Sequence, residues 1–226
     1  MENKERKNAG TAAVAQSPWD THYLKTKSIL AYPDENLVRM IKAFLIGKKP
    51  HTLASIDLGC GTGRHLKLLH ESGFDNIMGL DTSLNALVMC KGLYILPLVQ
   101  GNNMSLPFKD SAFDVAISWG SLHYCAKELL KQQLSEIHRI MKKGGRFFGT
   151  LRSDMDTYLK TGKNIGNDTW VTDIPDIKNS VVSFYNESEL KDAMSIFRAF
   201  KYGTIERTII GDMQKRISHW VFWADK

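Results

Sequence analysis

The fold of this 226-residue chain is decided by one stretch, Ala54-Ser55-Ile56-Asp57-Leu58-Gly59-Cys60-Gly61-Thr62-Gly63-Arg64-His65. It begins as an apolar run typical of a buried strand, passes through three alternating glycines and continues into a helical pattern. One acid, Asp57, precedes the glycines, and a second, Asp81, follows the next apolar run. Glycines let backbone approach a ligand closely, and the second acid can accept hydrogen bonds from both ribose hydroxyls. The stretch therefore predicts a nucleoside-binding site on a parallel α/β sheet.

The glycine spacing indicates which nucleoside binds. A dinucleotide fingerprint reads G-x-G-x-x-G, whereas this chain alternates Gly59, Gly61 and Gly63. Asp57 beside the turn would repel a pyrophosphate and suits a cation. S-adenosylmethionine carries a sulfonium and an ammonium and no phosphate, so it fits this pattern. A nicotinamide-dependent oxidoreductase is the alternative that the spacing disfavours.

The sequence resembles class I S-adenosylmethionine-dependent methyltransferases across roughly residues 54–151. Residues 57–63 are similar to the first motif of that family, and residues 79–83 to the second, whose acid holds the ribose. Residues 101–108 are similar to the adenine-binding stretch, and residues 136–148 to the helix, Gly-Gly turn and strand that close the core. Each segment alone is a weak signal, but four in order at family spacing are strong.

The resemblance implies S-adenosylmethionine as cofactor and S-adenosylhomocysteine as product. One position departs from the family, because Asn102 stands where an acid usually accepts a hydrogen bond from the adenine amino group. An amide can still accept that bond through its oxygen, but without charge assistance. The backbone amide of Asn103 or Met104 is expected to contact the adenine ring. The implied cofactor-binding residues are Asp57, Gly59, Gly61, Gly63, Asp81, Thr82, Asn102, Asn103, Met104, Trp119 and Tyr23.

Apolar runs and helical stripes alternate along the core, which predicts a parallel sheet with helices on both faces. A capping box at Asn186 opens a further helix through Phe197. The expected fold is a Rossmann-like, seven-stranded, mostly parallel sheet with an antiparallel C-terminal hairpin. Strands are expected near 54–58, 75–80, 96–99, 113–118, 145–151, 201–210 and 215–223, and core helices near 63–72, 83–93 and 127–141.

The chain length suits a single domain, here residues 17–226. Residues 1–16 are polar and aperiodic and are expected to form a disordered arm. Residues 17–50 are expected to form a helical cap. Residues 152–182 carry little pattern, and so long a segment in a compact domain is usually functional, so we expect a substrate lid or insert.

Bulk composition is ordinary for a globular protein, and the net charge of +6 comes from scattered lysines and arginines. That balance fits solubility, and it leaves an acidic or RNA substrate open. Three cysteines without metal spacing predict reduced thiols in a cytoplasmic protein. No apolar run is long enough for a membrane span or a signal peptide, and no histidine pattern predicts a metal site.

The segment after the fourth predicted strand is expected to lie beside the transferred methyl group. His123 there is the candidate general base, since a histidine pKa lies near neutrality; the alternative is a structural histidine. Tyr124 and, ahead of the core, Trp19 are candidate substrate contacts, as is Arg152 after the fifth strand. For these aromatic residues, core packing is the competing interpretation.

These observations predict transfer of a methyl group to an oxygen or nitrogen atom of a small-molecule acceptor such as a metabolite, sugar or natural product. The protein is expected to be a monomer or homodimer without a nucleic-acid or membrane partner. Two alternatives stay open. The acceptor is RNA or protein, which the basic N-terminal arm would favour, or the chain binds S-adenosylmethionine without catalysis.

Overall fold

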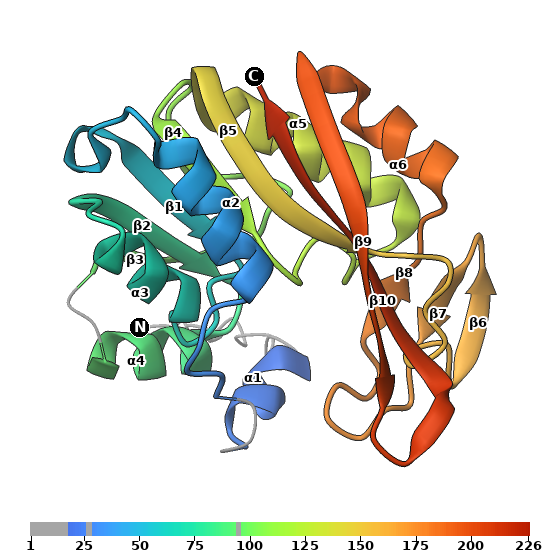
Figure 1. Ribbon diagram of the computed structural model, residues 1–226. Coiled ribbons are helices and arrows are strands. Elements are labelled where there is room, and N and C mark those ends of the chain that lie inside the picture. The colour runs from blue at the N-terminus through green and yellow to red at the C-terminus, as the bar shows by residue number, and fades with distance from the viewer. Residues whose placement is uncertain (1–17, 26–28, 94–95) are drawn as a thin grey trace, which may run out of the picture.

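The computed structural model describes residues 18–25, 29–93 and 96–226. Within them, seven strands form one sheet in the order β3-β2-β1-β4-β5-β10-β9 (Figure 1). Strands β1 to β5 are parallel, and β10 runs antiparallel to both of its neighbours. The bounds are β1 Ala54–Leu58, β2 Asn76–Asp81, β3 Leu98–Gln100, β4 Phe113–Ser118, β5 Met141–Arg152, β9 Ala199–Ile209 and β10 Asp212–Asp225.

This topology confirms the predicted Rossmann-like sheet with its antiparallel C-terminal hairpin. Strand β1 is buried along its whole length because it lies at the centre of the sheet, which explains its continuous apolar run. Strand β5 begins at Met141 rather than at residue 145, because the chain turns directly from helix into extended backbone after Ile140.

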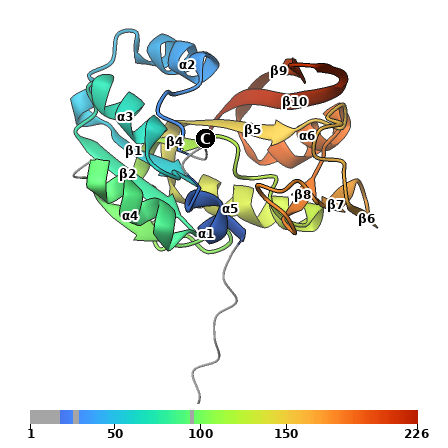
Figure 2. The ribbon, with the colours of Figure 1, turned by 90° about the horizontal axis from the view of Figure 1, so that it is seen from below.

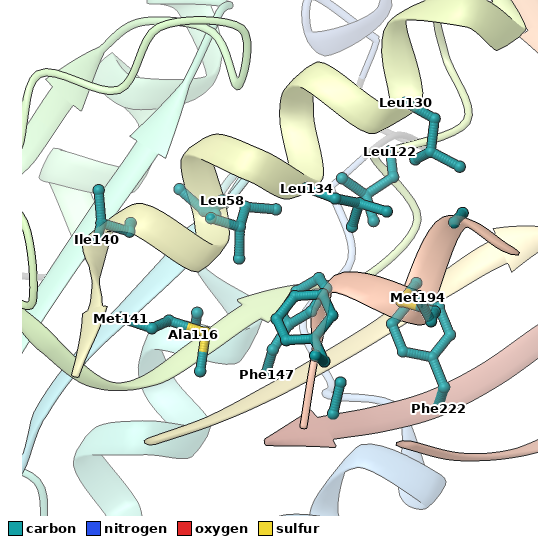
Figure 3. Close-up of a cluster of buried hydrophobic side chains, with 14 of the residues drawn as sticks. Leu58, Ala116, Leu122, Leu130, Leu134, Ile140, Met141, Phe147, Met194 and Phe222 are labelled. Atoms are coloured by element: carbon teal, nitrogen blue, oxygen red, sulfur yellow. The ribbon is translucent and has the colours of Figure 1, made fainter. Parts of the chain in front are cut away.

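Helices cover both faces of the sheet, with α2 and α5 on opposite sides (Figure 2). On the α5 face, Leu134 packs with Phe147 and Phe222 of the sheet in one buried cluster (Figure 3). The predicted capping box is present, since the Asn186 and Glu189 side chains each accept the other's backbone N–H. The bounds are α1 Pro18–Tyr23, α2 Glu35–Leu45, α3 Arg64–Glu71, α4 Leu84–Leu93, α5 Leu130–Ile140 and α6 Glu187–Ala193.

The segment after β5 contains a feature that the sequence does not reveal. In the described part of the chain, β6 Lys163–Gly166, β7 Thr169–Val171 and β8 Val181–Ser183 form a second, antiparallel sheet. These strands are short, and β6 is exposed throughout, so they lack a readable alternation of apolar residues. Their buried side encloses Leu159 and Phe184 and packs against Trp19 of α1.

The N-terminal region is described in part. The arm predicted for residues 1–16 lies outside the described residues, while the predicted cap region contains α1 and α2. No helix among the described residues combines the length and the apolar character needed to cross a lipid bilayer.

Candidate cofactor and active site

The glycine turn connects β1 to α3 at the carboxyl end of the sheet. Gly59, Gly61 and Gly63 have φ values of 78°, 52° and 93°, a region that side-chain-bearing residues rarely adopt. The Gly59 N–H donates to the Leu80 carbonyl at 2.7 Å, which ties the turn to β2. A Cβ on Gly59 would lie 2.5 Å from the Cβ of Ser121 in the loop after β4. The turn therefore needs glycine both for conformation and for the close approach of that loop.

Asp81 ends β2 beside this turn. Its carboxylate accepts the backbone N–H groups of Gly61 and Ser83, each at 2.8 Å. Burial raises the pKa of Asp81, and these backbone hydrogen bonds oppose the rise. Each carboxylate oxygen keeps a lone pair free for a further donor, so a ribose diol can be recognised here.

A cavity of about 620 Å³ opens at this edge of the sheet. Asp81 is the single charged residue among the described residues that line it. The cavity reaches from the ends of β2 and β3 to α1, the loop after β4 and the insert. Its lining includes the predicted residues Trp19, Tyr23, Gly59, Asp81, Thr82, Asn102, Asn103, Met104 and Tyr124.

A smaller cavity of about 210 Å³ lies over the glycine turn. It is lined by Gly61, by Arg64 at the start of α3, and by Trp119. The Tyr23 hydroxyl projects onto this turn, since a Cβ on Gly61 would lie 2.5 Å from it. Residues of the first and second predicted motifs thus line two cavities, and Tyr23 lines both of them.

Asp57 lies beneath the turn and is fully buried. Neither of its carboxylate oxygens has a hydrogen-bond partner within the described residues, and His65 Nδ1 stays 3.7 Å away. Burial raises the pKa of Asp57 to about 7, while Arg64 opposes the rise. A buried carboxylate without donors favours a nearby positive charge, which fits a cationic ligand on this turn.

The stretch after β3 forms the far wall of the larger cavity. Asn102 Oδ1 accepts the Met104 backbone N–H at 2.9 Å, and Asn103 Nδ2 donates to Gln133 Oε1 at 3.3 Å. The amide oxygen and the backbone N–H that we expected to meet adenine are thus bonded to each other. The Asn102 Oδ1 atom has a second lone pair for an incoming amino group.

Helix α1 spans the opening between the main sheet and the insert (Figures 1 and 2). Asp20 Oδ1 accepts from Ser83 Oγ at 2.7 Å on the α4 side, and Asn85 Nδ2 donates to the Asp20 carbonyl. On the insert side, Lys25 pairs with Asp176 at 3.7 Å. These contacts hold Trp19 and Tyr23 over the cavities.

Four of the predicted residues are absent from the lining of both cavities. Asp57 and Gly63 still belong to the glycine turn and the strand beneath it, whereas His123 and Arg152 do not. His123 is fully buried, and burial, Arg152 and His219 lower its pKa well below the usual range, so its imidazole stays neutral. Arg152 is also buried and pairs with Asp156 at 2.5 Å instead of facing a substrate. Both placements have one cause, because the insert covers the ends of β4 and β5: the Ser183 N–H of β8 donates to the His123 carbonyl, and Asp156 pairs with Arg152.

Sequence reasoning expected a substrate lid or insert in residues 152–182 but named none of its cavity residues, and it missed the contribution of α5. Asn179, Ser180 and Val181 line it from the insert, and Gln133 lines it from α5. The length of the patternless segment is the one signal that pointed to the insert as a substrate wall. Gln133 carried no signal, because a lone polar residue on a helix is usually solvated.

Known proteins share this fold and part of this sequence. The family model for a methyltransferase domain matches residues 56–149. A solved S-adenosylmethionine-dependent methyltransferase from Methanosarcina mazei has the same fold, with a TM-score of 0.64 at 17% identity over 83% of this chain and 96% of that one. Residues 56–149 therefore form a class I S-adenosylmethionine-dependent methyltransferase domain. The resemblance carried by the four sequence motifs is thereby confirmed.

Relatives of this chain differ in length and in the functions that their names give. An uncharacterized protein of Methanocaldococcus jannaschii is 35% identical over 161 residues, which are 71% of this chain and 52% of that protein. A protein of Mus musculus named Probable tRNA methyltransferase 9B is 32% identical over 110 residues, 47% of this chain and 23% of that protein. The chain thus spans about half of the archaeal relative and about a quarter of the murine one.

Proposed function

We propose that this protein transfers the methyl group of S-adenosylmethionine to an oxygen or nitrogen atom of a small-molecule acceptor. The observation that carries the proposal is the larger cavity, which joins the Asp81 end of the site to a wall of aromatic and uncharged polar side chains. That cavity is large enough for an adenosyl group together with part of an acceptor.

The chain offers a partner for each part of the cofactor. Asp81 would hold the ribose hydroxyls, and the stretch Asn102–Met104 would border the adenine. The glycine turn, with Asp57 beneath it and Arg64 beside it, suits the ammonium and carboxylate of the methionine part. When bound, the cofactor supplies a methyl group activated by its positively charged sulfur.

The chain's contribution to the transfer is to orient the acceptor and exclude water. Tyr124 and Trp19 face the cavity from two elements, and Asn179 and Ser180 add uncharged polar groups. Among the described lining residues of the larger cavity there is no lysine, arginine or histidine. This lining supports a neutral or weakly polar acceptor, rather than a phosphate-rich one that would need cations.

The test is a methyl-transfer assay with radiolabelled S-adenosylmethionine and a panel of amines, phenols, sugars and carboxylic acids, alongside bulk tRNA. We expect label in at least one small molecule, and an Asp81→Ala variant should lose that signal. Label confined to tRNA would overturn the small-molecule proposal while leaving the methyltransferase activity in place.

One observation favours RNA as the second candidate acceptor. The murine relative carries a tRNA methyltransferase name, and its similarity covers 47% of this chain. The net charge of +6 is compatible with an RNA partner, but several of the cations are paired locally, as in Arg146 with Asp225 and Lys142 with Asp114. We therefore rank RNA below a small molecule.

A further inference from the structure

The two cavities meet at a small group of residues. Of the described residues, Trp19, Tyr23, Gly59, Gly120 and Tyr124 line both. Three of the five are aromatic, and the other two are glycines, which add no side chain. This junction carries no formally charged group of its own.

The position of the junction relates it to the chemistry of the cofactor. The larger cavity contains Asp81 and the stretch after β3, which suit an adenosyl group, and the smaller one contains the glycine turn and Arg64, which suit a methionyl group. The atom that joins these two halves of S-adenosylmethionine is the positively charged sulfur. On the proposed function, that sulfur would therefore lie at the junction, among Trp19, Tyr23 and Tyr124.

The aromatic rings at the junction are held in place by polar contacts outside it. Trp19 and Tyr124 pack edge to face, with ring centroids 4.5 Å apart. The Arg152 guanidinium, which pairs with the buried Asp156, lies close enough to Tyr124 to oppose the rise that burial causes in the pKa of its hydroxyl. Asp20 accepts a hydrogen bond from Ser83 and so anchors α1, the helix that contains Trp19 and Tyr23. These contacts favour one arrangement of the rings, and such preorganisation lowers the entropic cost of binding.

Aromatic rings attract cations through the negative potential of their faces, and the attraction grows where water is excluded. A neutral thioether gains nothing comparable. We propose that Trp19, Tyr23 and Tyr124 form an aromatic cage that recognises the positive charge on sulfur and makes this protein prefer S-adenosylmethionine to S-adenosylhomocysteine. The inference rests on the proposed function, because it assumes that the site takes this cofactor.

The experiment is titration calorimetry of the full chain with S-adenosylmethionine and S-adenosylhomocysteine, read as the ratio of the two dissociation constants. Trp19→Leu and Tyr124→Leu should each reduce the preference for the charged ligand by about fivefold or more, whereas Tyr124→Phe should keep most of it. The matched control is Leu129→Ala. Leu129 lines the larger cavity but not the smaller one, so this variant should weaken the binding of both ligands by the same factor.

The outcomes separate the cage from the cofactor assignment. If the wild-type protein binds neither ligand, the proposed function itself fails. If both ligands bind but the ratio is unchanged in Trp19→Leu and Tyr124→Leu alike, the cage is overturned and the cofactor site stands. Trp19 is half-buried on a six-residue helix, so its variant tests the cage even if Tyr124→Leu does not fold.

Discussion

The Asp57 carboxylate is buried beneath the glycine turn without a hydrogen-bond donor within the described residues. Its pKa is raised to about 7 because burial disfavours the charged form. In the unfolded chain the same carboxyl ionises near its ordinary value of about 4. Between those two values the folded protein therefore holds a proton that the unfolded chain has released.

This difference predicts how stability depends on pH. The contribution of Asp57 to the free energy of unfolding should fall as pH rises from about 4 to about 7, by about 4 kcal/mol in total. An Asp57→Asn variant should lack this decline. Urea unfolding of both proteins at several pH values would measure it. A parallel pH dependence in the two proteins would contradict the prediction.

At the scale of elements, the insert is joined to the main sheet through Asp156. This carboxylate accepts from Arg152 of β5, from the Ser218 N–H of β10 at 2.9 Å and from the Leu159 N–H at 3.0 Å. One buried carboxylate thus ties two strands of the large sheet to the start of the insert. Arg152 depends on it in turn, because a buried guanidinium needs a partner.

Replacing Asp156 by Asn should destabilise the protein by about 3–5 kcal/mol, because it leaves the charge of Arg152 buried and uncompensated. The matched control is Asp173→Asn, an exposed position of the same insert, which should change stability by less than about 0.5 kcal/mol. Chemical unfolding of the three proteins under one set of conditions measures both values. Equal stability of the Asp156 and Asp173 variants would show that the buried pair does not hold the insert.

The elements that the sequence predicted well are those with strong periodicity. Strand β1 reads as an apolar run because both faces of it are covered, and α6 was located by its capping box. The strands of the insert escaped because each has few residues, and Asn167 and Asp168 at the turn of β6 and β7 carry positive φ values. Propensity alone does not favour a hairpin turn of that kind over a loop.

At the scale of the whole molecule, the site residues also divide into those whose position the sequence predicts and those whose surroundings it does not. Motif residues such as Asp81 were predictable, because they follow directly from local chain geometry at the end of a strand. The environment of His123 was not, because it depends on Ser183, which lies 60 residues further along the chain. The environment of Arg152 was not either, because the fold of the insert, and not a local pattern, brings Asp156 against it. Burial of a polar side chain by a remote segment is a tertiary effect that no local pattern encodes.

The whole molecule closes around the two cavities, since the main sheet, α1 and the insert all contribute walls. Cofactor that binds the folded protein alone should therefore stabilise it globally. At a concentration a hundredfold above the dissociation constant the gain is about 2.7 kcal/mol. For a chain of this length that corresponds to a rise in Tm of about 5–10 °C.

Thermal unfolding with and without S-adenosylmethionine measures this shift. In an Asp81→Ala variant the Tm without ligand should also fall, because the Gly61 and Ser83 amides lose their acceptor. The diagnostic quantity is therefore the ligand-induced shift, which should vanish in the variant at the same ligand concentration. A shift that persists there would mean that the ligand is held without Asp81, and the ribose role assigned to this carboxylate would have to be abandoned.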